Sequence, residues 1–292
     1  MSVYLRSLAC VVALHAAVAS LSAQIRSLQD VAYTPGGTAQ QTLDLTVPTQ
    51  PRGFATLLLV HGGGLTEGDK RDFELPAICA NVVRAGVGCV SVNYRLGPVV
   101  HWPSQPNDVA GAVGWVRHHI GEYGGDSTAI FLLGHSSGCL LASMLGTDPA
   151  YLRSARLAPE ALAGVIAMGC LLAPVLPAVS DSARLRSFFT GSAALATFGS
   201  LEAFVDANAT AHAGPHVPPT LVLIAEAEQI NPPILQRARE FEARMHSVNR
   251  PVEVVVLPDR RHITALTGMS APDDPTLQLV LSFMRTTIAA RR

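Results

Sequence analysis

The sequence predicts an α/β fold with a mainly parallel central sheet that helices cover on both faces. Short apolar runs of strand length alternate with longer segments in which apolar residues recur every three or four positions. Two of these runs end in glycine-rich turns, and the turns that follow parallel strands gather at one edge of a sheet. The 292 residues suffice for a single domain with a large buried core.

The first half of the chain contains three early strands and then an alternation of helix and strand. The expected elements are strands at 31–34, 43–47 and 55–60, a helix at 73–85, a strand at 88–93 and a helix around 109–120. In this last helix Val109, Val113, Val116 and Ile120 are spaced by three or four residues, which places them on one face. No helix separates the earliest strands, so they can pair antiparallel.

The second half continues the alternation. The expected elements are a strand at 129–133, a helix at 138–145, strands at 165–170 and 221–225, a helix opened by Pro232 and Pro233, a strand at 252–257 and a last helix. In the last helix Asp274 can accept hydrogen bonds from the first free N–H groups, and Pro275 suits the first turn.

The least regular segment, 171–218, lies between two of the expected core strands. It is rich in Ala, Ser, Gly and Pro, and its aromatic residues are Phe188, Phe189, Phe198 and Phe204. We expect a small helical lid that shapes a substrate pocket. The alternative is a structural connection whose aromatic side chains fill the core.

The pentapeptide Gly134-His135-Ser136-Ser137-Gly138 has the features of a nucleophile elbow. It joins the strand at 129–133 to the helix at 138–145. So sharp a turn holds its middle residue, Ser136, in a strained backbone geometry and exposes its hydroxyl, while the glycines leave room for the crowded chain. The pattern is short and turns are rich in Gly and Ser, so an ordinary turn is the alternative. The flanking strand and helix favour catalysis.

A second glycine-rich turn, His61-Gly62-Gly63-Gly64, follows the strand at 55–60. Acyl transfer places negative charge on the carbonyl oxygen, and backbone N–H groups of a loop without side chains can converge on that oxygen. The expected donors are the N–H groups of Gly63, Gly64 and Ser137. The alternative is a glycine-rich turn without a catalytic role.

A serine nucleophile needs a base, and the base needs an acid that orients it. His262 follows the last expected strand, where the base is required when the chain order is Ser, acid, His. The other later histidines either precede the expected acid or lie within a helical pattern; they are His212, His216 and His246. His262 is therefore the predicted base.

The acid is expected just beyond the strand at 221–225, where Glu226 and Glu228 stand. Glu228 is our first choice because it lies further along the loop, at the place that Asp usually takes. The alternatives are Glu226, Asp259 and the pair Asp273 and Asp274.

These motifs together resemble the α/β-hydrolases of the esterase/lipase branch that carry an HGGG oxyanion loop. The resemblance spans about residues 31–290 and includes Asn93-Tyr94-Arg95-Leu96-Gly97-Pro98, Asp108 and Tyr123-Gly124-Gly125-Asp126. It implies an α/β-hydrolase fold and a serine hydrolase that cleaves carboxylic esters through an acyl-enzyme, with no metal and no organic cofactor. Many relatives read G-D-S-A-G at the elbow, whereas this chain has His135 and Ser137, and its acid is Glu.

The resemblance favours a compact esterase, similar to feruloyl or acetyl esterases. An aryl-formamidase or another amidase would use the same triad on an N-acyl bond, and a binding module without catalysis could share the fold.

The formal net charge is −1 with 15% charged residues and no basic cluster. This composition gives no electrostatic basis for binding nucleic acid or an anionic membrane, and it favours a neutral small-molecule ester.

Residues 1–23 resemble a secretory signal peptide, which leaves 24–292 as the hydrolase domain. Arg6 precedes an apolar stretch at 8–18 that is too short to span a bilayer, and Ala23 suits cleavage before Gln24. A disordered or anchoring tail is the alternative. We therefore expect a secreted or periplasmic protein whose mature chain starts close to the first strand, without the long N-terminal cap of many hormone-sensitive-lipase relatives.

Four cysteines remain beyond the predicted signal peptide: Cys79, Cys89, Cys139 and Cys170. An exported protein permits disulfides, but each cysteine lies in an apolar stretch and the spacings are neither CxxC nor those of a small disulfide scaffold, so buried free thiols are at least as good an expectation. His212 and His216 stand four residues apart without a clustered carboxylate or thiol, and we expect no metal site there.

Overall fold

The computed structural model describes residues 25–170, 172–173, 187, 189–190, 194–230 and 234–291. The predicted signal peptide at 1–23, Phe188, the two prolines Pro232 and Pro233 and part of the 171–218 segment lie outside these residues.

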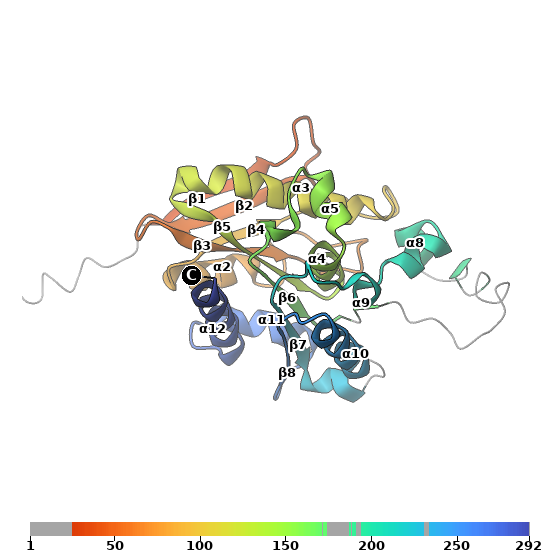
Figure 1. The fold of residues 1–292 in the computed structure, drawn as a ribbon. Helices are drawn as coiled ribbons and strands as arrows, with labels where there is room; N and C mark the ends of the chain where they lie inside the picture. Colours follow the sequence, from red (N-terminus) through yellow and green to blue (C-terminus); the bar gives the residue numbers. More distant parts are fainter. Residues whose placement is uncertain are drawn as a thin grey trace, which may run out of the picture.

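Within the described residues, one eight-stranded sheet runs through the middle of the molecule in the order β1-β2-β4-β3-β5-β6-β7-β8 (Figure 1). The strands are β1 (Ile25–Ala32), β2 (Thr42–Pro48), β3 (Phe54–Val60), β4 (Gly88–Val92), β5 (Gly125–His135), β6 (Gly164–Met168), β7 (Thr220–Ala225) and β8 (Val252–Leu257). Strand β2 is antiparallel to both of its neighbours, and all other pairings are parallel. The predicted mainly parallel sheet is confirmed, and of the three early strands β1 and β2 pair antiparallel, whereas β3 is parallel to both of its neighbours.

Helices cover both faces of the sheet, as the sequence predicted (Figure 1). One face carries α3 (Ser104–His119), α4 (Ser137–Thr147), α5 (Pro149–Ser154), α9 (Ala209–His212) and α10 (Ile234–Ser247). The other carries α2 (Leu75–Arg84), α11 (His262–Thr267) and α12 (Pro275–Ala290). In β3, Leu58 and Val60 face the first core while Leu57 and Leu59 face the second, which explains why its apolar run is continuous.

The remaining elements are short. Helices α7 (Ala194–Phe198) and α8 (Leu201–Asp206) belong to the segment predicted as a lid. Single 3₁₀ turns are η1 (Ile120–Tyr123), η2 (Pro159–Ala161), η3 (Glu226–Ile230) and η4 (Gly268–Ser270).

The element boundaries differ from prediction mainly at the sheet edge. The first strand covers 25–32 rather than 31–34, because β1 is an edge strand with mostly exposed residues and so lacks an apolar alternation. The six-residue helices α5 and α11 were not predicted, since one and a half turns give too few positions for a periodic pattern. The predicted cap of the last helix is confirmed: Asp274 accepts hydrogen bonds from the N–H groups of Thr276 and Leu277.

Of the two alternatives that the sequence leaves open for the four described cysteines, the structure has the disulfides and not the buried free thiols. Cys79 of α2 bonds Cys89 of β4, and Cys139 of α4 bonds Cys170 just beyond β6. The Cα–Cα distances are 5.2 and 5.7 Å, within the range that a disulfide requires. Sequence spacing could not reveal these pairs because the fold sets which cysteines become neighbours.

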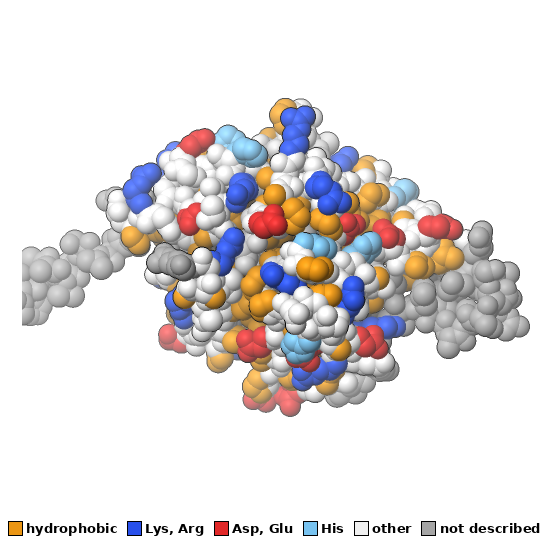
Figure 2. Space-filling view, viewed as in Figure 1, with side chains coloured by type: hydrophobic (Ala, Val, Ile, Leu, Met, Phe, Trp, Pro, Cys, Tyr) orange, Lys and Arg blue, Asp and Glu red, His pale blue; other side chains and the backbone are white. Residues whose placement is uncertain are grey.

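Charged side chains of both signs are interspersed on the face shown in Figure 2. This distribution agrees with the formal net charge of −1. Among the described helices, none is long and apolar enough to cross a membrane.

Candidate active site

Ser136 lies at the turn between β5 and α4 in a conformation that few non-glycine residues adopt. Its φ is 56° and its ψ is −123°. A Cβ on Gly134 would lie 2.0 Å from the carbonyl oxygen of Gly138, and a Cβ on Gly138 would lie 2.3 Å from that of Val60. Both glycines are therefore required by the close passage of main chain. This geometry is that of a nucleophile elbow, which presents its serine at the carboxyl edge of the sheet.

The loop His61-Gly62-Gly63-Gly64 follows β3 and lies directly against the elbow. A Cβ on Gly62 would lie 3.0 Å from the Cβ of Ser136. Gly63 and Gly64 have φ values of 112° and 62°, and a Cβ on Gly63 would collide with the carbonyl oxygen of Glu67 at 2.1 Å. The third and fourth residues of the motif must therefore be glycine for conformational reasons.

The N–H groups of Gly63, Gly64 and Ser137 have no hydrogen-bond acceptor within the part of the chain that the structure describes. Ser137 is the first residue of α4, where N–H groups lack intrahelical acceptors. Its Oγ accepts a hydrogen bond of 3.3 Å from the N–H of Leu65, so it links the elbow to the glycine loop. The predicted oxyanion donors therefore belong to two adjoining segments and are unsatisfied.

Tyr94 contacts His61 and so holds the start of the glycine loop in place. The buried Tyr94 ring stacks on the His61 ring with centroids 4.4 Å apart, and Tyr94 Oη donates to the carbonyl oxygen of His61 at 3.0 Å. Next to it, Arg95 donates from both Nε and Nη2 to Asp108 at 2.8 Å. These contacts give the Asn93-Tyr94-Arg95 motif and Asp108 a structural role around the site.

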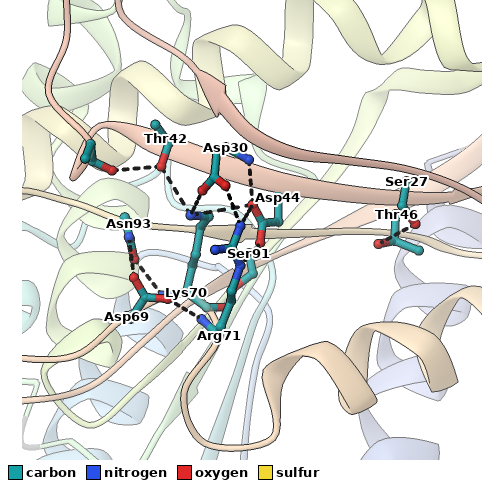
Figure 3. Close-up of polar contacts among 11 residues, drawn as sticks. Ser27, Asp30, Thr42, Asp44, Thr46, Asp69, Lys70, Arg71, Ser91 and Asn93 are labelled. Atoms are coloured by element: carbon teal, nitrogen blue, oxygen red, sulfur yellow. Dashed lines mark hydrogen bonds and ion pairs between the residues drawn. The ribbon is translucent and has the colours of Figure 1, made fainter.

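A buried lysine, Lys70, holds the chain that follows the glycine loop to the sheet (Figure 3). The Lys70 side chain is 2% exposed, and its Nζ lies 2.6 Å from Asp30 Oδ1 and 3.5 Å from Asp44 Oδ1. The Lys70 N–H donates to Asn93 Oδ1 at 2.6 Å. Arg71 pairs with the same two aspartates. The ion pairs offset the cost of burying the ammonium group, and sequence reasoning missed this cluster because charged loop residues are usually exposed.

Glu228 and His262 form a hydrogen-bonded pair. Glu228 lies in η3, just past β7, and His262 is the first residue of α11, just past β8. Glu228 Oε1 lies 2.5 Å from His262 Nδ1, and Glu228 Oε2 accepts the N–H of Ala225 at 2.8 Å. Burial would raise the pKa of Glu228, but the hydrogen bonds from His262 and Ala225 outweigh it and hold that pKa below its ordinary value.

Two of the alternative acids, Glu226 and Asp274, have other partners. Glu226 is exposed and accepts a hydrogen bond of 2.8 Å from the N–H of Asp259. Asp274 caps α12 and pairs with Arg260.

Two of the other later histidines also have partners elsewhere. His216 Nε2 lies 2.6 Å from the carbonyl oxygen of Thr147, and His212 Nε2 lies 3.2 Å from Asp206 Oδ1.

One cavity of about 710 Å³ joins the predicted catalytic residues. Ser136, Ser137, Glu228 and His262 line it, together with an apolar wall of Leu140, Cys170, Leu172, Ala173, Phe198, Phe204, Ala207 and Ile234. The structure thus brings three residues from separate segments, Ser136, Glu228 and His262, to one apolar pocket. In the described part of the chain, no group of three or more His, Cys, Asp or Glu side chains is arranged to hold a metal ion.

The sheet order and the elbow are those of the α/β-hydrolase fold, and the chain is similar to known proteins in sequence and in structure. Residues 43–154 match the BD-FAE family. The chain is 30% identical over 244 residues to the probable carboxylic ester hydrolase LipM of Mycobacterium tuberculosis and 27% identical over 248 residues to its esterase LipC, covering 77% and 82% of this chain. It spans 52% of the length of LipM and 59% of that of LipC.

The fold is also that of solved esterase structures. Esterase B from Lactobacillus rhamnosis, solved in an inhibited form, superposes with a TM-score of 0.71 at 19% identity, over 98% of this chain and 96% of that one. The chain therefore has the α/β-hydrolase fold and is similar in sequence to carboxylic ester hydrolases.

Proposed function

We propose that this protein is a serine esterase that hydrolyses carboxylic esters through an acyl-enzyme. The observation that carries the proposal is the shared pocket, in which a serine at a strained elbow and a His262–Glu228 pair face an apolar wall. The names of the sequence relatives LipM and LipC, a probable carboxylic ester hydrolase and an esterase, support esters as substrates.

In the proposed mechanism, His262 removes the proton from Ser136 Oγ as that oxygen attacks the ester carbonyl carbon. Nδ1 of His262 is hydrogen-bonded to Glu228, so Nε2 is the nitrogen that accepts the proton. The N–H groups of Gly63, Gly64 and Ser137 stabilise the oxyanion. His262 returns its proton to the departing alcohol, and water then attacks the acyl-enzyme by the same route to release the acid.

We propose that the 171–218 segment forms part of the substrate pocket as a lid. Leu172, Ala173, Phe198, Phe204 and Ala207, which line the cavity, come from this segment. The wall is uncharged there, which favours neutral acyl or alcohol groups. A p-nitrophenyl ester series of increasing acyl length measures how much of the cavity the acyl group fills, and Phe204→Ala should shift the optimum to longer chains. An unchanged optimum would contradict the lid proposal.

The test of the esterase proposal is the variant Ser136→Ala. We expect it to keep the thermal transition of the wild-type protein and to lose turnover of p-nitrophenyl esters by about 10³-fold or more. A fluorophosphonate should label the wild-type protein at Ser136 and leave the variant unlabelled. Retained turnover or labelling in the variant would contradict the proposal.

We also propose that the protein is exported. Its two disulfides support this proposal because disulfides persist in oxidising compartments. N-terminal sequencing of protein from the extracytoplasmic fraction should begin at Gln24. A chain that stays in the cytoplasm with residues 1–23 attached would contradict it.

A further inference from the structure

His135 stands directly before Ser136 and is buried in the site, yet the proposed hydrolysis assigns no task to its side chain. It is the last residue of β5 and is 1% exposed. Its ring packs against the His262 ring with centroids 4.6 Å apart and planes at 38°. Its Nε2 lies 2.9 Å from the main-chain oxygen of His262. His135 therefore contacts the proposed base at two points.

The contact with the carbonyl oxygen determines which nitrogen of His135 carries the proton. A carbonyl oxygen only accepts, so the Nε2 of His135 must donate and its Nδ1 has a lone pair. This Nδ1 is buried and has no hydrogen-bond partner among the described residues. A donor at Nδ1 would be left unsatisfied there, which adds to the preference for the Nε2–H form.

The charged form of His135 is unfavourable at this place. Burial, the largest effect, lowers the pKa of His135, and the charge of His262 also lowers it. The hydrogen bond to the main chain of His262 and the charge of Glu228 raise that pKa, and the net result is a pKa of about 4. The ring is therefore neutral near pH 7 and adds no positive charge beside His262 when His262 takes the serine proton.

The surroundings of His135 leave its ring little freedom. A Cβ on Gly62 would lie 3.5 Å from its Nδ1, so the glycine loop borders one side. The Phe73 ring, just ahead of α2, lies 6.4 Å away between centroids. His135 thus occupies a fixed place between the glycine loop and His262.

We propose that His135 is a positioning residue for the base: its Nε2–H holds the main chain of His262, and its ring supports the imidazole that serves the neighbouring Ser136. Glu228 orients that imidazole through Nδ1, while His135 fixes the backbone from which it extends. This inference rests on the proposed esterase function and goes beyond it, because it adds a residue that touches neither the substrate nor the transferred proton.

The test compares two substitutions at one position. His135→Leu fills a similar volume without a donor, whereas the amide nitrogen of His135→Gln can take the place of Nε2. Small misplacement of a catalytic group can cost about 10²-fold in rate. We expect His135→Leu to lower kcat for a p-nitrophenyl ester by about 10- to 100-fold with KM within about threefold, and His135→Gln to recover most of the loss.

His216→Leu is the matched control. His216 also directs its Nε2 to a distant main-chain oxygen, that of Thr147 at 2.6 Å, but it lines a different cavity from Ser136. Its loss should lower the thermal transition and leave kcat within about twofold. A merely structural role for His135 would make the two leucine variants behave alike.

Wild-type kcat in His135→Leu would overturn the inference, as would equal losses in His135→Leu and His135→Gln. Side-chain ¹H–¹⁵N spectra of the wild-type protein test it without any variant: His135 should be neutral with its proton on Nε2 between pH 6 and 8, and a proton on Nδ1 would overturn it. Failure of the esterase function is a separate outcome, because it appears as the absence of Ser136-dependent turnover in the wild-type protein.

Discussion

Glu228 is ionised in a place where burial opposes its charge. The hydrogen bonds from His262 and Ala225 more than offset burial and lower the pKa of its carboxyl group in the folded protein. A depressed folded-state pKa stabilises the protein above the unfolded-state pKa, and this stabilisation is lost as pH falls through the folded-state pKa. Glu228 therefore provides both a negative partner for His262 and an acid-sensitive contribution to stability.

Glu228→Gln should lower kcat by about 10³- to 10⁴-fold, because the amide cannot stabilise the imidazolium form of His262 and favours the wrong tautomer. Glu226→Gln is the matched control, since the same isosteric change two residues earlier removes only an exposed contact to the Asp259 N–H. Its kcat should stay within about threefold. Steady-state kinetics on one p-nitrophenyl ester decide the matter, and the reverse ranking would make Glu226 the acid.

The wild type and the Glu228→Gln variant also test how the contribution of Glu228 to stability depends on pH. At neutral pH the wild type should be more stable than Glu228→Gln in urea unfolding, because only the wild type has the charged partner for His262. The difference in the free energy of unfolding should shrink as pH falls through the acidic range, where protonated Glu228 resembles Gln. A difference that grows toward acid pH would show that burial, which raises the pKa, dominates at Glu228.

The place of a single residue beside the cavity was predictable from sequence where its signal is local. Ser136 and His262 are marked by a motif or a strand that adjoins them. Glu228 and Glu226 could not be separated with certainty, because the choice depends on how η3 turns one carboxylate back to the Ala225 N–H. The contacts of His135 were beyond sequence reasoning, since its hydrogen-bond partner lies 127 residues away along the chain.

At the scale of elements, the tight contact between α4 and the end of β3 joins the nucleophile to the glycine loop. Gly138 makes that contact possible, since a Cβ there would lie 2.3 Å from the oxygen of Val60 and 2.4 Å from that of His61. Both atoms belong to main chain, which cannot yield as a flexible side chain can. The approach of α4 to the sheet is therefore set by the absence of one side chain.

Gly138→Ala and Gly111→Ala should have opposite effects although both glycines lie in helices. Gly138→Ala forces α4 away from β3, so we expect a loss of about 1–3 kcal/mol or more in stability together with reduced kcat. In α3, a Cβ on Gly111 would meet Tyr33 ring atoms at 3.6 and 3.7 Å and Thr34 Oγ1 at 3.8 Å, which are ordinary contacts. This second change should stabilise by about 0.5–1 kcal/mol and leave kcat unchanged. Urea unfolding with parallel kinetics tests both, and equal effects would refute the packing explanation.

Element type was easier to predict than element boundaries. Strand β3 and the long helix α3 have strong patterns, and the structure has both near the expected residues. The exposed strand β1 and the short helix α11 lack such patterns because their structure depends on neighbours: β1 on pairing with β2, and α11 on contacts with β7 and η4.

At the scale of the whole molecule, one disulfide reinforces each side of the sheet. Cys79 and Cys89 belong to the core under α2, whereas Cys139 belongs to the opposite core and Cys170 packs against it. The first disulfide joins two cysteines that are only 10 residues apart in the sequence, one in α2 and one in β4. The second joins cysteines 31 residues apart, with α5 and β6 between them, and its Cys170 also lines the cavity beside Ser136.

These differences predict how the molecule responds when each bridge is removed. From the entropy of loop closure, Cys139→Ala/Cys170→Ala should cost about 4 kcal/mol and Cys79→Ala/Cys89→Ala about 3 kcal/mol. Only Cys139→Ala/Cys170→Ala should change KM, because only this double variant alters the cavity wall. Urea unfolding and ester kinetics on the two double variants measure both effects, and non-reducing peptide maps of the wild type should recover both linked peptide pairs. Alkylated Cys139 or Cys170 in such a map, or a KM change confined to the Cys79–Cys89 variant, would contradict the assignment of one structural bridge and one bridge at the site.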